Sequence, residues 1–240
     1  MSDAQQGEAL APRWLPLESN PELLNSFLKR MGVESNVAFH DVFGLDEELL
    51  AMVPQPCVAL CLLFPCDNIT APRRAEWKEK AMLEPENKDV FYLKQLDQFG
   101  NACGTIACVH AVANAPGVSF TKESALHDFI IKNKGLEAEK IGFNLANEPS
   151  VQEASDQSAS DETAQTETPD RDDIVNHHFV SFTYKDGRLI ELDGRMEGPL
   201  DHGPSSAETF LSDAAKVIRE QFMALDPENV GFNVTALCVE

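Results

Sequence analysis

The residue best suited to chemistry in this chain is Cys103, a thiol at the start of a run that is predicted to be helical. Residues 90–94 are predicted to form a strand, and 95–102 a loop that holds two glutamines and a glycine. Residues 104–112 have helical character until Asn114-Ala115-Pro116-Gly117 ends the helix. Unpaired amides and the positive dipole end at a helix N-terminus stabilise a thiolate. Cys103 is therefore a candidate nucleophile, with a buried structural thiol as the alternative.

A predicted hairpin downstream supplies a histidine and an aspartate that can act with this thiol. Side chains alternate in direction along 178–184, Asp186-Gly187 is a two-residue turn signal, and 189–193 returns as a strand. With this turn, His178 is a diagonal neighbour of Asp193 on the same face, roughly 7 to 8 Å away at the backbone. His177 points to the opposite face, and a slip of one residue would reverse the choice between the two histidines.

A thiol, an imidazole and a carboxylate divide the work of nucleophilic catalysis. The imidazole takes the thiol proton and later protonates the leaving group, while the carboxylate fixes the tautomer and orientation of the imidazole. Spacing alone does not show that the hairpin meets the helix. The alternatives are that His178 is an ordinary sheet histidine and that Asp193 is a turn residue.

The elements that must position these residues follow from periodicity and capping signals. Ser205 and Glu208 form a capping-box pattern before a long helix that reaches Phe222. Further helices are predicted at 21–32, from about 46, at 73–82 and at 122–132, and a strand at 234–239.

The composition limits the class of protein. With 240 residues and 43% hydrophobic content, the chain can bury a core of its own, and one domain over residues 1–240 is the simplest organisation. The longest apolar run is too short to cross a bilayer, so we expect a soluble protein without a membrane partner. The net charge of −21 argues against nucleic acid as a partner. It suits a basic protein surface, and solubility of the protein explains it equally well.

Cysteine usage points to a reducing compartment. The six cysteines are too few and too clustered for a disulfide scaffold, and none has a second pair nearby to complete a zinc site. We therefore expect free thiols and no metal. We also expect a monomer in the cytoplasm, with the nucleus as a second location.

Several segments, in one order along nearly the whole chain, strongly resemble the ubiquitin carboxyl-terminal hydrolase family of cysteine proteases. The resemblance is weak only in 67–88 and 133–174. The segments are Arg13-Trp14-Leu15-Pro16-Leu17-Glu18, Met52-Val53-Pro54, Asn101-Ala102-Cys103-Gly104-Thr105, His178-Phe179, Glu191-Leu192-Asp193-Gly194-Arg195 and Phe232-Asn233.

The resemblance implies a fold and a catalytic set. It implies an α+β protein with a papain-like core, in which helices flank a central antiparallel sheet and the backbone is knotted. Cys103 would be the nucleophile, His178 the general base and acid, and Asp193 the residue that orients it, with no metal or organic cofactor.

A glutamine before the cysteine would donate to the oxyanion, and here the sequence departs from the family pattern. Gln95 follows Lys94 as in the family but stands eight residues before Cys103, where six is usual; Gln98 stands five before. We favour Gln95, because the predicted strand fixes it and the two extra residues can bulge, and keep Gln98 as the alternative. Its amide would join the Cys103 N–H in holding developing charge.

The resemblance also implies contacts with the substrate. Pro16, Leu17 and Glu18 would line the cleft for the Gly-Gly end of ubiquitin, with Leu17 as the wall that rejects larger side chains. Asp41 resembles an acidic position near the bound tail, although an ordinary strand-end carboxylate explains it equally well.

The segment 148–173 is polar and acidic, and is predicted to be a flexible loop because it has few large apolar residues to bury. Its position matches the family's crossover loop, which passes over the active site, and a plain surface linker is the alternative. Substrates that must thread past it would carry small or flexible leaving groups.

These patterns together predict a thiol-dependent deubiquitinating hydrolase that frees the C-terminal glycine of ubiquitin through an acyl-enzyme on Cys103. Two alternatives stay open: a hydrolase of another ubiquitin-like modifier, and a ubiquitin-binding protein with an unproductive triad.

Overall fold

A six-stranded antiparallel sheet forms the centre of the protein in the computed structural model, which describes residues 13–81 and 90–239. The strands run in the order β1-β6-β2-β3-β4-β5. They are β1 (Val37–Asp41), β2 (Cys57–Pro65), β3 (His177–Lys185), β4 (Arg188–Leu192), β5 (Leu200–Pro204) and β6 (Asn233–Val239). The α-helices are α1 (Pro21–Arg30), α2 (Glu47–Leu50), α3 (Thr70–Ala81), α4 (Cys103–Asn114), α5 (Ala125–Asn133), α6 (Ala138–Ala146), α7 (Pro149–Ala159) and α8 (Phe210–Gln221), with 3₁₀ turns η1 (Asp97–Phe99) and η2 (Met223–Leu225).

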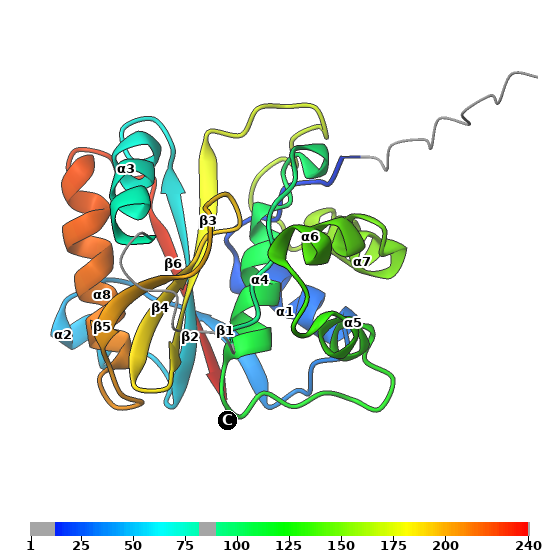
Figure 1. The fold of residues 1–240 in the computed structure, drawn as a ribbon, viewed down its shortest axis with the longest axis horizontal. Helices are drawn as coiled ribbons and strands as arrows, with labels where there is room; N and C mark the ends of the chain where they lie inside the picture. Colours follow the sequence, from blue (N-terminus) through cyan, green and yellow to red (C-terminus); the bar gives the residue numbers. More distant parts are fainter. Residues whose placement is uncertain (1–12, 82–89, 240) are drawn as a thin grey trace, which may run out of the picture.

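The helices cover the two faces of this sheet separately (Figure 1). One apolar core lies between the sheet and α1, α4, α5, α6 and α7, and another between the sheet and α8. Neighbouring residues of β3 belong to different cores, since Phe179 packs on the α4 side and Val180 on the α8 side. The predicted antiparallel sheet flanked by helices is confirmed. No helix in the described ranges has the length and apolar character of a membrane span.

The β3–β4 hairpin has the predicted turn and register. Asp186 and Gly187 both adopt positive φ, 50° and 78°, as a two-residue turn of the primed type requires. Phe182 therefore pairs with Glu191 and Ser181 with Leu192. This register places Asp193 directly after β4, close to the first residues of β3.

Helix α8 begins with a different cap from the predicted one. Its first residue is Phe210, and the reciprocal bonds join Ser206 and Thr209: the Ser206 N–H donates to Thr209 Oγ1 at 3.0 Å, and the Thr209 N–H to Ser206 Oγ at 3.2 Å. The prediction of a Ser205–Glu208 box is wrong by one residue. Both pairs have the same spacing, and a hydroxyl at residue 209 completes the box as well as a carboxylate.

The predicted strand at 90–94 is also wrong. This segment runs beside α4, and side chains and loops accept its backbone N–H groups. Phe91 donates to Asn114 Oδ1 at 2.7 Å, and Leu93 donates to His110 Nε2 at 3.1 Å. Lys94 donates to the carbonyl of Ala138, the first residue of α6, at 3.1 Å. The segment satisfies its polar groups without a neighbouring strand.

The first half of the segment predicted to be a flexible loop is helix α7. Its buried residues are Val151, Ala154, Ser155, Ser158 and Ala159, which follow the i, i+3, i+4, i+7, i+8 spacing of one helix face. The buried hydroxyls are satisfied: Ser155 bonds to Thr105 of α4 at 2.6 Å, and Ser158 donates to the Ala154 carbonyl at 2.8 Å. Small side chains bury little area each, so composition alone did not reveal this face.

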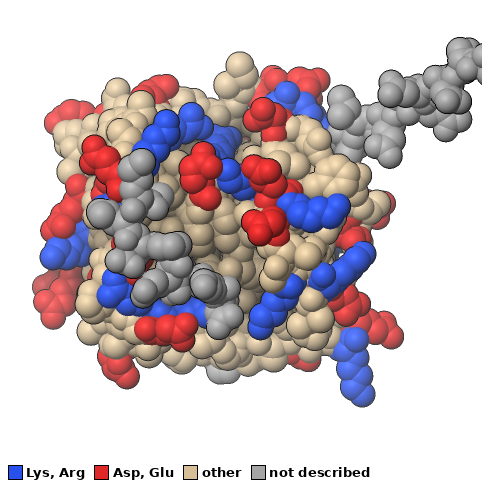
Figure 2. Space-filling model, in the orientation of Figure 1, with Lys and Arg blue, Asp and Glu red and all other residues tan. Residues whose placement is uncertain are grey.

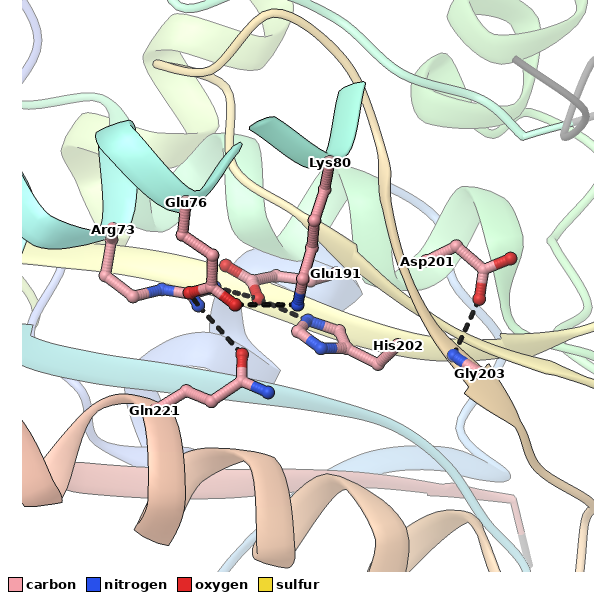
Figure 3. Close-up of polar contacts among 8 residues, drawn as sticks. All are labelled: Arg73, Glu76, Lys80, Glu191, Asp201, His202, Gly203 and Gln221. Carbon is pink, nitrogen blue, oxygen red and sulfur yellow. Dashed lines mark hydrogen bonds and ion pairs between the residues drawn. The ribbon is translucent and has the colours of Figure 1, made fainter. Parts of the chain in front are cut away.

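A buried polar cluster joins four elements away from Cys103 (Figure 3). Arg73 of α3, 2% exposed, donates to Glu191 of β4 at 2.5 Å and to Gln221 of α8 at 2.9 Å. His202 of β5 contacts the same Glu191 oxygen at 2.7 Å, and Glu76 pairs with the arginine at 2.5 Å. The cluster ties α3, β4, β5 and α8 together.

Candidate active site

Cys103 is the first residue of α4, as predicted. The N-cap residue, Ala102, has no side chain that can accept a hydrogen bond, so the first N–H groups of the helix keep their capacity to donate. Gly104 lets the helix approach its neighbours, because a Cβ there would meet Leu17 Cβ at 3.0 Å and the Phe179 ring at 3.2 Å. The local sequence thus sets the thiol against β3 and against the segment that holds Leu17.

His178 and Asp193 are paired, as the hairpin register predicts. The imidazole Nε2 lies 2.7 Å from Asp193 Oδ1, and both side chains are buried. The other ring nitrogen, Nδ1, is buried and has no hydrogen-bond partner among the described residues, while the Cys103 thiol lies close enough for the thiol and the imidazole to shift each other's pKa. Phe64 packs edge-on against the ring at 5.7 Å between centroids. The structure therefore brings all three residues together.

The electrostatics favour a thiolate and an imidazolium. Burial raises the pKa of Cys103, but the interaction with the His178 imidazole, helped by the charge of Arg195, outweighs burial and lowers it. Burial lowers the pKa of His178, yet the charge and hydrogen bond of Asp193 raise it to about 9. Burial opposes ionisation of Asp193 too, but the imidazole lowers its pKa, as does the Arg195 N–H that donates to Oδ1 at 2.9 Å. This combination activates a sulfur nucleophile at neutral pH.

These shifts predict the pH dependence of hydrolysis. The thiolate forms as pH rises through the lowered Cys103 pKa, and the imidazolium is lost as pH rises through about 9. We expect kcat/KM to follow a bell whose basic limb lies near pH 9. In Asp193→Asn that limb moves to lower pH, because the charge that raises the His178 pKa is gone. Rates measured from pH 5 to 10.5 that never decline on the basic side would contradict the assignment.

Gln95 is fixed beside the Asp193 turn, whereas Gln98 lies within η1. The Gln95 N–H donates to the Gly194 carbonyl at 2.8 Å, and its Nε2 donates to the Gly100 carbonyl at 3.0 Å. Its Oε1 is buried without a partner in the described chain. The described contacts bring neither glutamine to the Cys103 N–H, so the oxyanion role stays a prediction.

Separate replacement of the two glutamines tests that role. We expect Gln95→Ala to lower kcat about a hundredfold with little change in KM, because it removes a donor that acts on the developing negative charge. Gln98→Ala, the matched control in the same loop, is expected to change kcat less than threefold. The reverse order of effects in steady-state assays would assign the role to Gln98, and equally small effects would exclude both.

A cavity of about 280 Å³ opens at Cys103. Pro16, Leu17 and Glu18 line it, as predicted for a substrate cleft. The lining also includes Leu63 of β2, His177 and Phe179 of β3, and Asn101 just before α4. From α7 and the segment after it come Ala159, Thr166, Thr168, Pro169 and Val175. The crossover segment therefore borders the site, as predicted.

Glu18 holds this crossover segment in place. Its Oε2 accepts hydrogen bonds from the Gln165 N–H at 3.1 Å, the Thr166 N–H at 3.1 Å and the Thr166 hydroxyl at 3.0 Å. Farther along, Arg171 donates to Asp156 of α7 at 2.8 Å. Glu18 thus has a structural task at the rim of the cavity that its sequence position did not reveal.

Asp41 lies away from the thiol. It lines a separate and larger groove of about 1490 Å³ between α2, α8 and the segment before β6. The exposed ring of Phe43 lines the same groove. The structure does not bring Asp41 to the Cys103 cavity, so any contact with substrate would be at a second surface. In the described ranges, no three His, Cys, Asp or Glu side chains gather in a way that could hold a metal ion.

Comparisons with known proteins agree with this geometry. The chain is 41% identical over 226 residues to a ubiquitin carboxyl-terminal hydrolase of Drosophila melanogaster, covering 93% of this chain and 96% of that protein. It is 40% identical over 224 residues to human ubiquitin carboxyl-terminal hydrolase isozyme L1, covering 93% and 97%.

A solved structure shares the fold. The UCH37 catalytic domain of Trichinella spiralis, solved bound to ubiquitin vinyl methyl ester, matches with a TM-score of 0.73 and 20% identity over 96% of this chain and 97% of that one. The family model described as "Ubiquitin carboxyl-terminal hydrolase, family 1" matches residues 14–224, which span both the Cys103 helix and the His178–Asp193 hairpin. The chain therefore belongs to the ubiquitin carboxyl-terminal hydrolase family 1 of cysteine peptidases.

Proposed function

We propose that this protein hydrolyses the bond between the C-terminal glycine of ubiquitin and an attached group, with Cys103 as nucleophile. The observation that carries the proposal is the buried His178–Asp193 pair at 2.7 Å, which acts on a thiol at a cavity. Relatives with about 40% identity over 93% of the chain are named as ubiquitin carboxyl-terminal hydrolases. The function class of the relatives and the chemistry of the site therefore agree.

The geometry supports a two-step reaction. The Cys103 thiolate attacks the glycine carbonyl carbon, and the carbonyl oxygen gains negative charge. Collapse of this intermediate breaks the bond to the leaving group, which takes a proton from the His178 imidazolium and departs. The neutral imidazole then removes a proton from water, the resulting hydroxide attacks the thioester, and the thiolate is released with free ubiquitin. The Cys103 N–H and the Gln95 amide would stabilise the charged oxygen.

The cavity supports a substrate that ends in glycine. Leu17 and Phe179, which pack against Gly104, also line the cavity of about 280 Å³ at Cys103, so part of its wall is apolar. A residue without a side chain fits such a cavity, and larger residues would meet the walls.

The surface charge supports a protein substrate. On the face drawn in Figure 2, Lys and Arg side chains are interspersed with Asp and Glu and form no broad basic surface. The net charge of −21 favours a basic segment, such as the arginine-containing tail of ubiquitin, over nucleic acid.

Comparison of modifiers tests the substrate. We expect fluorogenic amides of ubiquitin to be cleaved with kcat/KM at least a hundredfold above those of the nearest ubiquitin-like modifiers. A preference for one of these modifiers would support the alternative hydrolase. Binding of ubiquitin without turnover would support the ubiquitin-binding alternative.

Because the crossover segment borders the cavity, we expect the protein to prefer substrates with small or flexible leaving groups. Figure 1 shows the chain that joins α7 to β3, and residues of this segment line the cavity at Cys103, so a bulky leaving group would meet it. We expect the variant Glu18→Ala, which removes the acceptor of three hydrogen bonds, to raise cleavage of ubiquitin fused to a folded domain several-fold relative to ubiquitin amide. Ser150→Ala, an exposed substitution on α7, serves as the control. An unchanged ratio of the two substrates would refute gating.

We also propose that the protein acts as a monomer in the cytoplasm, with the nucleus as a second location. All six cysteines are free, which suits a reducing compartment, and one chain supplies the complete Cys103–His178–Asp193 set. Recovery with secreted material in cell fractionation, or a concentration-dependent rise in kcat on dimer formation, would contradict this proposal.

A further inference from the structure

The turn that carries Asp193 has an additional anchor, the hydroxyl of Tyr92. Tyr92 Oη lies 2.8 Å from the Asp193 carbonyl oxygen and 2.6 Å from the Met196 carbonyl oxygen. The phenol carries one proton, which these two acceptors share. Tyr92 stands in the segment 90–96, which has no regular secondary structure, and its side chain is buried.

Hydrogen bonds hold both the side-chain carboxylate and the backbone carbonyl of Asp193. Its carboxylate oxygen Oδ1 accepts from the Arg195 N–H at 2.9 Å and contacts His178 Nε2 at 2.7 Å. Its carbonyl accepts from the Met196 N–H at 3.0 Å and from the Tyr92 hydroxyl. The hydroxyl thus bonds to both ends of the turn 193–196, and movement of this turn would displace the carboxylate from the imidazole.

The ring of Tyr92 is placed by α4, the helix that carries the nucleophile. It stacks on the His110 imidazole with centroids 5.3 Å apart and planes 13° apart. His110 is fully buried and its Nε2 accepts from the Leu93 N–H at 3.1 Å. Burial lowers the pKa of His110 to about 4, so this ring is neutral at working pH. Tyr92 therefore contacts both α4, the helix that begins at Cys103, and the turn that carries Asp193.

We propose that Tyr92 is a positioning residue for the hydrolysis, whose hydroxyl fixes the 193–196 turn and thereby holds the Asp193 carboxylate in the place that orients His178. The proposal rests on the proposed function of the Cys103 site. The groups that face this hydroxyl are Asp193, Glu197 and His110. Burial and the charges of the two carboxylates raise the pKa of Tyr92 well above its usual value, so the phenol stays protonated and donates throughout the working pH range.

The chain offers a matched control, because it contains two tyrosines. Tyr92→Phe keeps the ring, its stack on His110 and its apolar contacts, and removes the hydroxyl alone. Tyr184→Phe removes the same atom from β3, where the ring is partly buried against the core on the α8 side. We expect Tyr92→Phe to lower kcat for a ubiquitin amide about tenfold with KM unchanged. Tyr184→Phe is expected to leave kcat within twofold.

A readout that needs no substrate separates positioning from support of the fold. When Asp193 is displaced, the imidazolium is less favoured and the thiolate loses its partner. The pH at which iodoacetamide alkylates Cys103 at half its maximal rate should therefore rise in Tyr92→Phe and stay constant in Tyr184→Phe. A lower melting temperature with unchanged kcat and unchanged alkylation profile would overturn the proposal and leave a purely structural role.

A double-variant cycle tests whether Tyr92 acts through Asp193. In the Asp193→Asn background, Tyr92→Phe should lower kcat less than twofold, because the group that it positions is already lost. A full tenfold loss in both backgrounds would overturn the proposed route. If the unmodified protein cleaves no ubiquitin amide, the proposed function fails by itself, and the alkylation profiles still decide the role of Tyr92.

Discussion

Replacement of Cys103 with alanine is expected to abolish hydrolysis of ubiquitin amides and esters. The variant lacks the sulfur that forms the acyl-enzyme, and loss of a hydrolase nucleophile lowers kcat by about 10⁶-fold. The fold should survive, because the change removes one buried atom from the start of α4 and leaves the His178–Asp193 pair in place. Initial rates with a fluorogenic ubiquitin amide measure the loss, and circular dichroism verifies the fold.

Cys66 provides the matched control for this variant. It is the half-buried cysteine of the chain, and its charge interacts with Cys103, so it is the other thiol near the site. Burial raises the pKa of Cys66, which keeps it protonated and weakly reactive. Cys66→Ala is expected to keep at least half of the activity. Turnover by Cys103→Ala above one part in about a thousand, or a large loss in Cys66→Ala, would contradict the assignment.

Replacement of Arg73 with methionine is expected to destabilise the protein by about 3–5 kcal/mol, the usual cost of removing one partner from a buried ion pair. Arg73 and Glu191 are 2% and 1% exposed, so the carboxylate would lose its main counter-charge without gaining water. Methionine keeps an unbranched side chain of similar length in the buried site, but it removes the guanidinium that lies over the Phe222 ring at 4.3 Å. The loss therefore reports the charged group as a whole, its pairing with Glu191 and its contact with this ring, and urea unfolding measures it.

An exposed pair and a double variant complete this test. Arg188 pairs with Asp201 at 2.8 Å, with side chains 43% and 32% exposed, so Arg188→Met should cost about 1 kcal/mol or less. Adding Glu191→Gln to Arg73→Met should recover stability, because the orphaned charge is removed and an amide can still meet His202. Equal losses in Arg73→Met and Arg188→Met, or additive losses in the double variant, would show that the cluster in Figure 3 is not coupled as described.

The sequence predicted the features that local rules determine. Asp186-Gly187 specifies a two-residue turn, the turn sets the register of β3 and β4, and the register brings Asp193 to His178. The start of α4 at Cys103 follows from the break between a loop and a run of small residues. A resemblance across several segments supplied what local rules lack, namely that the hairpin meets the helix.

Features that depend on contacts between distant segments were missed. The 90–94 segment has the composition of a strand, but side chains of α4 satisfy its N–H groups. Helix α7 buries small side chains against α4. Its buried face shows in the sequence only in the spacing of these small residues, because they are not strongly apolar. Arg73 and Tyr92 each contact partners more than 100 residues away, so no local pattern reveals them.

The most direct test of the account is to identify the atom that captures the substrate carbonyl. Ubiquitin with a C-terminal vinyl methyl ester should form one covalent adduct with the full chain, and peptide mass spectrometry should place the adduct on Cys103 and leave the other five cysteines unmodified. Rapid quenching with an ester substrate should show the corresponding thioester. An adduct on any other residue, or turnover that persists when Cys103 remains unmodified, would contradict the account.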